Sequence, residues 1–263
     1  MNRPIGIFDS GIGGLTVARA VKDLLPKEAI VYFGDTANLP YGDKDTATIQ
    51  DHALRICDLL LKRQCKVILM ACNSAAAAAY DLVQAYVGKR AAVLNVIDPM
   101  VNHIGSQFKG QPIGLIGTRQ TVQSGIYARK IQALRLDVQL KALATPLLVP
   151  MIEASFTQGI NQEIIDNYLQ SPVLQHIEAL ILGCTHYPAI KTQIQTFYQH
   201  RLAVLDATTM TATYLRNFLV YHQLLSTYYQ GQDHFVVSAL TADFEKATRI
   251  FFGEAVHLEE LTD

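Results

Sequence analysis

Two cysteines of this chain stand in matching sequence surroundings. Cys72 follows the apolar run 67–71, Cys184 follows the apolar run 179–183, and two polar residues come after each cysteine. A short apolar run followed by a helical stretch is typical of a buried parallel strand that enters a βα turn. A cysteine at that turn lies near a helix N-terminus, where the partial positive charge favours thiolate over thiol. The pair predicts one site with a thiol on each of two sides of its substrate.

The other two cysteines fit a plainer interpretation. Cysteine is often fully buried and packs as a small hydrophobe. This suits Cys57, on the apolar face of a predicted helix, and Cys65, just before a strand. Polar neighbours instead predict a semi-exposed cleft for Cys72 and Cys184, with a lowered thiol pKa. A zinc site needs three or four well-placed ligands, and Cys72, Cys184 and His186 together make only a poor set. We therefore predict no metal.

Polar residues near other strand ends allow two interpretations each. The turn 9–14 departs from the dinucleotide fingerprint at Thr16. It could present backbone N–H groups to a small carboxylate beside Asp9, or Asp9 and Ser10 could merely cap a helix. Tyr41 and Gly42 could offer a hydroxyl and a bare backbone to a ligand, or Tyr41 could simply pack.

Two further ionisable residues, His186 and Glu153, can be interpreted from their neighbours in the sequence. His186 could be a base, an acid or a helix cap. Glu153, shortly after Pro150, is interpreted as a first-turn helix carboxylate without a further role.

The elements that must position these residues alternate between strand and helix. We expect strands at 5–8, 29–33, 67–71 and 92–96, a surface loop at 34–44, and a second unit that begins at 113–118 and closes with a strand at 203–205. The separation of Gly6 from Cys72 resembles that of Gly114 from Cys184, as a duplication would leave it. A helix at 211–229, a strand at 235–237 and a helix at 242–252 are expected to return to the first unit.

The predicted fold class is therefore α/β, with two pseudo-symmetric, doubly wound domains and mainly parallel sheets. The first domain comprises 1–97 plus 207–263, and the second comprises 98–206. The active site is expected in the cleft between them, at the carboxyl ends of the strands.

Composition excludes several classes of function. The chain has 263 residues, a net charge of −1 and no run of Lys or Arg, so nucleic acid is not expected as a partner. No stretch reaches the roughly 18 apolar residues of a membrane helix, so no membrane is expected either. The N-terminus lacks a signal-peptide core, and four cysteines without metal spacing fit a reduced cytoplasm.

Four motifs in this order resemble bacterial glutamate racemases, of the aspartate/glutamate racemase family. They are Asp9-Ser10-Gly11-x-Gly13-Gly14, Gly34-Asp35-Thr36-Ala37-x-x-Pro40-Tyr41-Gly42, Ala71-Cys72-Asn73-Ser74-Ala75 and Leu182-Gly183-Cys184-Thr185-His186-Tyr187-Pro188. The resemblance implies interconversion of L- and D-glutamate without a cofactor, to supply D-glutamate for peptidoglycan. It also implies a homodimer.

Residue roles follow from the same resemblance. Cys72 and Cys184 match the catalytic thiols, which by family analogy act on the D and the L enantiomer respectively, and Asp9 and His186 match the polar residues that assist them. The matching substrate contacts are Asp9, Ser10, Tyr41, Gly42, Asn73, Ser74, Thr118, Thr121, Thr185 and His186.

The chain departs from the family pattern at three places. Ser74 stands where threonine is common, although the hydroxyl is kept. The segment Ser238-Ala239-Leu240 is atypical of the family. The N-terminal extension of the precursor-activated members is not expected, so their regulation is not carried over.

Three rival functions stay open from the residues. A racemase for aspartate or another acidic amino acid would share every motif. A cysteine hydrolase built on Cys184 and His186 would leave Cys72 without a purpose. A two-lobed binding protein fits the architecture but not the two thiols in its cleft.

Overall fold

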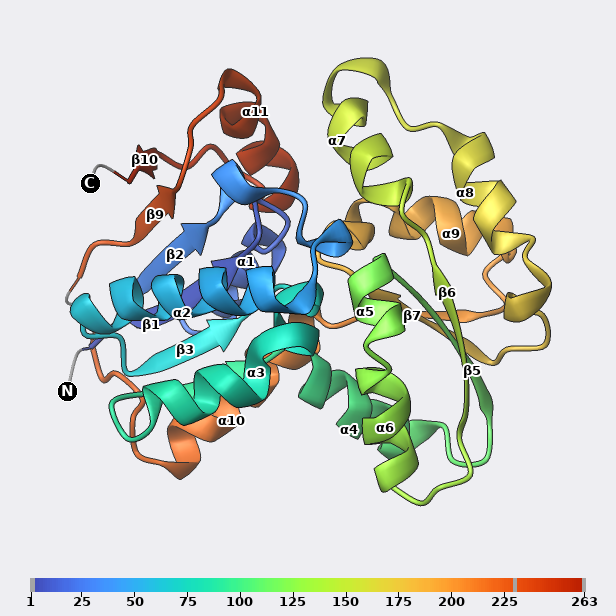
Figure 1. Cartoon of the computed structure of the whole chain (residues 1–263), viewed down its shortest axis with the longest axis horizontal. Coiled ribbons are helices and arrows are strands. Elements are labelled where there is room, and N and C mark those ends of the chain that lie inside the picture. The colour runs from blue at the N-terminus through green and yellow to red at the C-terminus, as the bar shows by residue number, and fades with distance from the viewer. Residues whose placement is uncertain (1–2, 229–230, 262–263) are drawn as a thin grey trace.

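The computed structural model describes residues 3–228 and 231–261, which form two lobes side by side, each built on a parallel sheet (Figure 1). In these residues the first sheet has the order β10-β9-β2-β1-β3-β4 and the second has the order β6-β5-β7-β8. The strands of the first sheet are β1 (Ile5–Asp9), β2 (Ile30–Gly34), β3 (Val67–Met70), β4 (Ala92–Asn95), β9 (His234–Val237) and β10 (Leu258–Glu260). Those of the second are β5 (Pro112–Gly117), β6 (Gln139–Ala144), β7 (Ala179–Gly183) and β8 (Ala203–Asp206).

The two sheets repeat one strand order. β2-β1-β3-β4 corresponds to β6-β5-β7-β8, and every recorded strand pair is parallel. Cys72 follows β3 and Cys184 follows β7, which occupy equivalent places in this order. The predicted α/β fold class with mainly parallel sheets is confirmed.

Helices that cover the sheets pack against them through apolar stripes, as α1 shows. In α1 (Leu15–Leu24) the residues Leu15, Ala18 and Val21 recur at helical spacing and are buried. Helix α1 therefore buries its apolar face. The other helices are α2 (Thr46–Lys62), α3 (Asn73–Val87), α4 (Ile97–Gln107), α5 (Arg119–Gln123), α6 (Ile126–Ala133), α7 (Leu148–Gln158), α8 (Gln162–Leu169), α9 (Lys191–Phe197), α10 (Thr208–Tyr221) and α11 (Ala242–Phe251).

Some predicted elements differ from those observed. The helix expected at 211–229 spans Thr208–Tyr221, and residue 229 lies outside the described residues. It ends early because Gln223 adopts a left-handed φ of 56° and the Leu224 N–H turns back to the Leu219 carbonyl. The expected loop at 34–44 contains the short 3-10 helices Thr36–Asn38 and Tyr41–Asp43.

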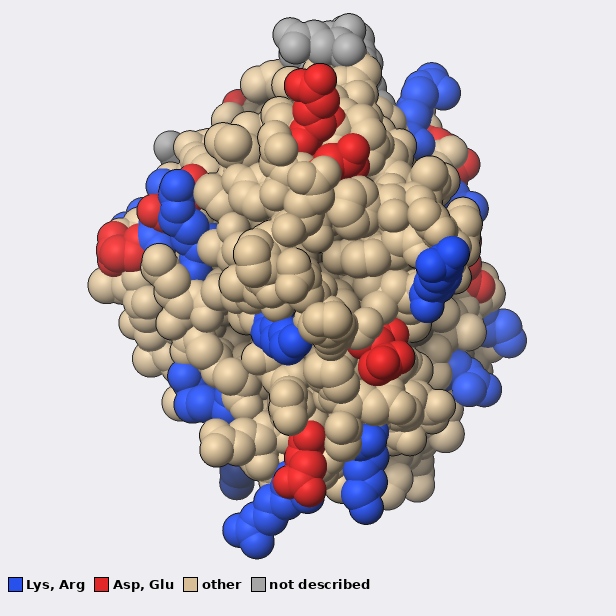
Figure 2. Space-filling view, turned by 90° about the vertical axis from the view of Figure 1, so that its right-hand side faces the viewer, with Lys and Arg blue, Asp and Glu red and all other residues tan. Residues whose placement is uncertain are grey.

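The charged residues on one face of the molecule and the lengths of its helices bear on the expected partners. On the face shown in Figure 2, Lys and Arg are scattered among Asp and Glu rather than gathered in a patch. Within residues 3–228 and 231–261, no helix is both long and apolar enough to cross a bilayer.

Candidate active site

One cavity lies where the carboxyl ends of the two sheets meet. Its wall includes Ser10 after β1, Cys72 after β3, Thr118 after β5 and Cys184 after β7. The space between the walls, with its open mouth, is about 590 Å³. Because the strands of each sheet are parallel, the side chains that follow them converge at one edge. The two cysteines therefore reach the same cavity from different lobes.

Most of the residues selected from the sequence line this cavity. They are Ser10, Tyr41, Gly42, Cys72, Asn73, Ser74, Thr118, Cys184, Thr185 and His186. Asp9 and Thr121 lie behind the wall, where Asp9 accepts a hydrogen bond from Thr185 and Thr121 contacts Ser74. The wall also contains residues that were not selected: Leu39, Pro40, Asp43, Arg119, Thr145, Pro146, Val149, Pro150 and Glu153.

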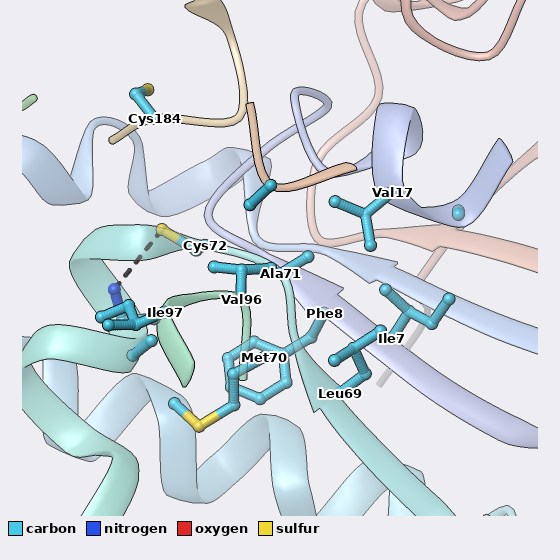
Figure 3. Close-up of a cluster of buried hydrophobic side chains, with 14 of the residues drawn as sticks. Ile7, Phe8, Val17, Leu69, Met70, Ala71, Cys72, Val96, Ile97 and Cys184 are labelled. Carbon is cyan, nitrogen blue, oxygen red and sulfur yellow. Dashed lines mark hydrogen bonds between the residues drawn. The ribbon is translucent and has the colours of Figure 1, made fainter. Parts of the chain in front are cut away.

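Cys72 occupies the N-cap of α3. Its Sγ accepts a hydrogen bond from the Ala75 N–H at 3.4 Å (Figure 3) and donates to Ser10 Oγ at 3.6 Å. Burial, followed by the nearby Asp9 carboxylate, raises the pKa of Cys72 to about 12. The prediction of a lowered pKa is wrong here, because desolvation outweighs the helix N-terminus. Cys72 is thus a neutral thiol, able to donate a proton.

Cys184 has a different electrostatic partner. Its Sγ lies 3.9 Å from Nδ1 of His186, whose Nε2 lies 3.1 Å from Oε1 of Glu153. Burial lowers the pKa of His186, but the hydrogen bonds to Cys184 and Glu153 outweigh this effect, so the net pKa is raised to about 10. An imidazole that is charged at neutral pH therefore lies beside the sulfur of Cys184.

The predicted semi-exposed setting of the cysteines is wrong. Cys72 is 5% exposed and Cys184 is 8% exposed, so both are buried in the wall of the cavity. Polar neighbours were misleading because Asn73, Ser74, Thr185 and His186 are themselves buried. These neighbours hydrogen-bond to protein groups rather than marking open solvent.

The interpretation of Glu153 is also wrong. It is the sixth residue of α7, beyond the first turn, and its carboxylate contacts His186. The preceding strand β6 was not predicted, so nothing in the sequence placed Glu153 near a strand end. Asp35 was missed as well, although it follows β2 as Ser10 follows β1, which was a usable signal.

Asp9 is fully buried at the end of β1. Its carboxylate accepts hydrogen bonds from Thr185 Oγ1 and from the backbone N–H groups of Gly14 and Ser10. Burial nevertheless raises the pKa of Asp9, against the lowering effect of His186 and of these hydrogen bonds. Part of the predicted anion site at this turn is therefore filled by the protein's own carboxylate.

Tyr41 turns its hydroxyl to a protein partner. The hydroxyl donates to Oδ2 of Asp35 at 2.5 Å, while Oδ1 of Asp35 accepts from Asn38 and Ser238. The atypical segment at 238–240 thus holds the loop that carries Tyr41. Tyr41 lines the cavity with its buried side chain, and its hydroxyl donor is committed to Asp35.

A hydroxyl cluster joins the two lobes beside Cys72. Ser74 Oγ lies 2.8 Å from Thr118 Oγ1 and 3.5 Å from Thr121 Oγ1, and the two threonine hydroxyls are 3.0 Å apart. Ser74 is in α3, whereas Thr118 is the N-cap of α5. The serine that departs from the family pattern thus keeps its hydroxyl contacts.

The unequal surroundings of the two thiols predict unequal alkylation. Thiolate is the reactive form, and burial raises the pKa of Cys72 to about 12, so Cys72 is mostly an unreactive thiol at pH 8. Iodoacetamide should therefore label Cys184 first, and labelling of Cys72 should rise about tenfold per pH unit between pH 7 and 10. Peptide mapping by mass spectrometry measures both rates. His186→Asn should slow labelling of Cys184, and faster labelling of Cys72 than of Cys184 at pH 8 would contradict this assignment.

Comparison with known proteins gives a consistent result. The family model described as Asp/Glu/Hydantoin racemase matches residues 15–215. The glutamate racemase of Neisseria meningitidis serogroup C is 37% identical over 261 residues, which cover 98% of this chain and 96% of that protein. The crystal structure of glutamate racemase from Francisella tularensis in complex with D-glutamate has a TM-score of 0.92 at 35% identity and covers 99% of this chain and 98% of that one. The glutamate racemase from Thermus thermophilus in complex with β-chloro-D-alanine has a TM-score of 0.85 at 35% identity, with coverage of 99% and 97%.

Proposed function

The chain belongs to the Asp/Glu/hydantoin racemase family, and from that premise we propose that it interconverts L- and D-glutamate by two-base proton transfer. The observation that carries the mechanism is the single cavity lined by Cys72 and Cys184 from different sheets. Racemisation removes the α-proton from one face of the amino acid and returns a proton to the other face. Two opposed thiols can do this without moving past the substrate.

The surroundings of the two thiols support a defined role for each. Cys184, whose sulfur lies beside the His186 imidazole, takes the α-proton of L-glutamate. Cys72 begins as thiol and protonates the opposite face of the resulting carbanion, which yields D-glutamate. The reverse reaction exchanges these roles, in agreement with the family analogy for Cys72 and Cys184.

The α-carbon is a far weaker acid than a thiol, so the site must stabilise the carbanion. Each pK unit of mismatch costs about 1.4 kcal/mol. The Ser10 hydroxyl, which lines the cavity and accepts from Cys72, can donate to the carboxylate oxygens on which negative charge develops. The buried walls strengthen these interactions by excluding water. Asp9 and His186 assist by holding and polarising the residues around each sulfur.

The remaining features of the proposal rest on family resemblance and on the fold. We propose that the reaction needs no cofactor and supplies D-glutamate for peptidoglycan in the cytoplasm. We propose a homodimer and two domains, 1–97 plus 207–263 and 98–206. The domain division is supported by the pairing of β9 with β2 in the first sheet.

Hydrogen exchange tests the function directly. The protein, with no cofactor added, should incorporate deuterium at Cα of L- and D-glutamate in deuterated water and produce the opposite enantiomer from each. Parallel assays with L- and D-aspartate should show at least about hundredfold lower kcat/KM, since a side chain shorter by one methylene loses contacts and alignment. Faster turnover of aspartate would support the acidic amino acid rival instead. A covalent acyl adduct on Cys184 in mass spectra would favour the hydrolase.

A further inference from the structure

Tyr127 is a buried tyrosine of the second lobe whose hydroxyl ends on a residue of the cavity wall. It is the second residue of α6 and is 1% exposed. Its hydroxyl donates to Oδ1 of Asn73 at 2.8 Å, and Asn73 is the first residue of α3, directly after Cys72. Asn73 lines the cavity and Tyr127 does not. Tyr127 can therefore affect a bound molecule only through another residue.

The hydrogen bond determines which edge of the Asn73 amide is free. A carboxamide has an acceptor oxygen and a nitrogen with two donors. With Oδ1 committed to the Tyr127 hydroxyl, the N–H groups are the edge that Asn73 can offer to the cavity. N–H donors suit a carboxylate, whereas a rotated amide would turn its oxygen toward one. Glutamate carries two carboxylates.

The turn before α6 holds Tyr127 in this position. Gly125, the N-cap of α6, has a left-handed φ of 66°, which glycine adopts without steric cost. Ser124 Oγ donates to the Thr121 carbonyl and accepts from the Ile126 N–H. The same segment reaches Ser74 through Thr118. The second lobe thus holds both residues that follow Cys72.

We propose that Tyr127 is a positioning residue, which orients the Asn73 amide so that its N–H groups meet a carboxylate of the substrate. The inference rests on the proposed function, because that function supplies the carboxylate. Tyr127 takes no part in proton transfer. It links the orientation of a substrate-binding side chain to the contact between the two lobes.

Tyr127→Phe removes the hydroxyl and keeps the ring. We expect KM for both enantiomers of glutamate to rise about tenfold, with kcat within about threefold, because the carboxylate contact is made in the ground state as well as in the transition state. Tyr80→Phe is the matched control. Tyr80 lies on α3, the helix that begins with Asn73, and its hydroxyl donates to the Val93 carbonyl at 3.3 Å. Tyr80 does not line the cavity, so removal of its hydroxyl should leave kcat/KM within about twofold.

A double-mutant cycle with Asn73→Ala distinguishes positioning from general structural support. If Tyr127 acts through Asn73, Tyr127→Phe should have no further effect on kcat/KM in the Asn73→Ala background. Where Asn73→Ala leaves too little turnover, calorimetric titration of the four proteins with D-glutamate completes the same cycle. Equal fold losses in both backgrounds, or an unchanged KM in Tyr127→Phe, would overturn the inference. A wild-type chain that fails to turn over glutamate would contradict the proposed function itself.

Discussion

Replacement of Cys72 or Cys184 by alanine is expected to lower the racemisation rate at least about thousandfold in both directions. General acid–base groups typically contribute about 10²- to 10⁴-fold each. In this site each thiol serves as the base in one direction and as the acid in the other, so neither direction survives the loss of one sulfur. Retained two-way racemisation in either alanine variant would refute the two-base mechanism. Circular dichroism of L- and D-glutamate solutions measures the rates.

The serine variants should separate the two thiols. With Cys72→Ser, the remaining Cys184 should still exchange the α-proton of L-glutamate, and with Cys184→Ser the remaining Cys72 should exchange that of D-glutamate. The pKa of Cys72 is about 12. Exchange by Cys72 at pH 8 should therefore be at least about tenfold slower than exchange by Cys184, and the gap should narrow as pH rises. Equal exchange rates at pH 8 would contradict the inferred starting state.

Cys57→Ala is the control for loss of a buried thiol. Cys57 is fully buried in α2, burial raises its pKa to about 12, and it does not line the cavity. The variant should lose some stability, about 1 kcal/mol for a small cavity, and should keep its kcat/KM within about twofold. Thermal unfolding measures the loss of stability, and the racemisation assay measures kcat/KM.

The parts of the fold that the sequence predicted well are the central strands. β1, β3 and β7 lie inside their sheets and are fully buried, so they read as continuous apolar runs. β6 and β10 were missed because they are edge strands with mixed composition, Gln139–Ala144 and Leu258–Glu260. An edge strand carries polar residues, which weaken the apolar signal on which the prediction depends.

The sequence predicts which residues form the candidate site better than it predicts their protonation states. The matching sequence positions of Cys72 and Cys184 are sufficient to predict that both line one cavity. The pKa of Cys72 was not predictable, because it depends on burial and on the Asp9 carboxylate, which lies far away in the sequence. The contact between Glu153 and His186 was missed for the same reason, since it joins α7 to the turn after β7.

The two lobes pack closely against each other at Gly13. A Cβ atom on Gly13 would lie 2.5 Å from Nδ1 of His186 and 2.7 Å from Oγ1 of Thr185. Both side chains are already fixed, His186 by Glu153 and Thr185 by Asp9. They have little freedom to move aside without breaking these hydrogen bonds. Even one methyl group at residue 13 must therefore displace the imidazole from Cys184 or hold the lobes apart.

Gly13→Ala is accordingly expected to lower kcat/KM for both enantiomers at least about hundredfold, since a shift of about 1 Å in a catalytic group can cost this much. Labelling of Cys184 by iodoacetamide should slow in the same variant, because the imidazole no longer lies beside its sulfur. Gly105→Ala is the matched control. Its Cβ would lie 2.9 Å from Cδ1 of Leu134, the flexible end of a side chain away from the cavity. That variant should keep kcat/KM within about twofold, and comparable losses in the two variants would show that the contact between Gly13 and His186 has no special role in catalysis.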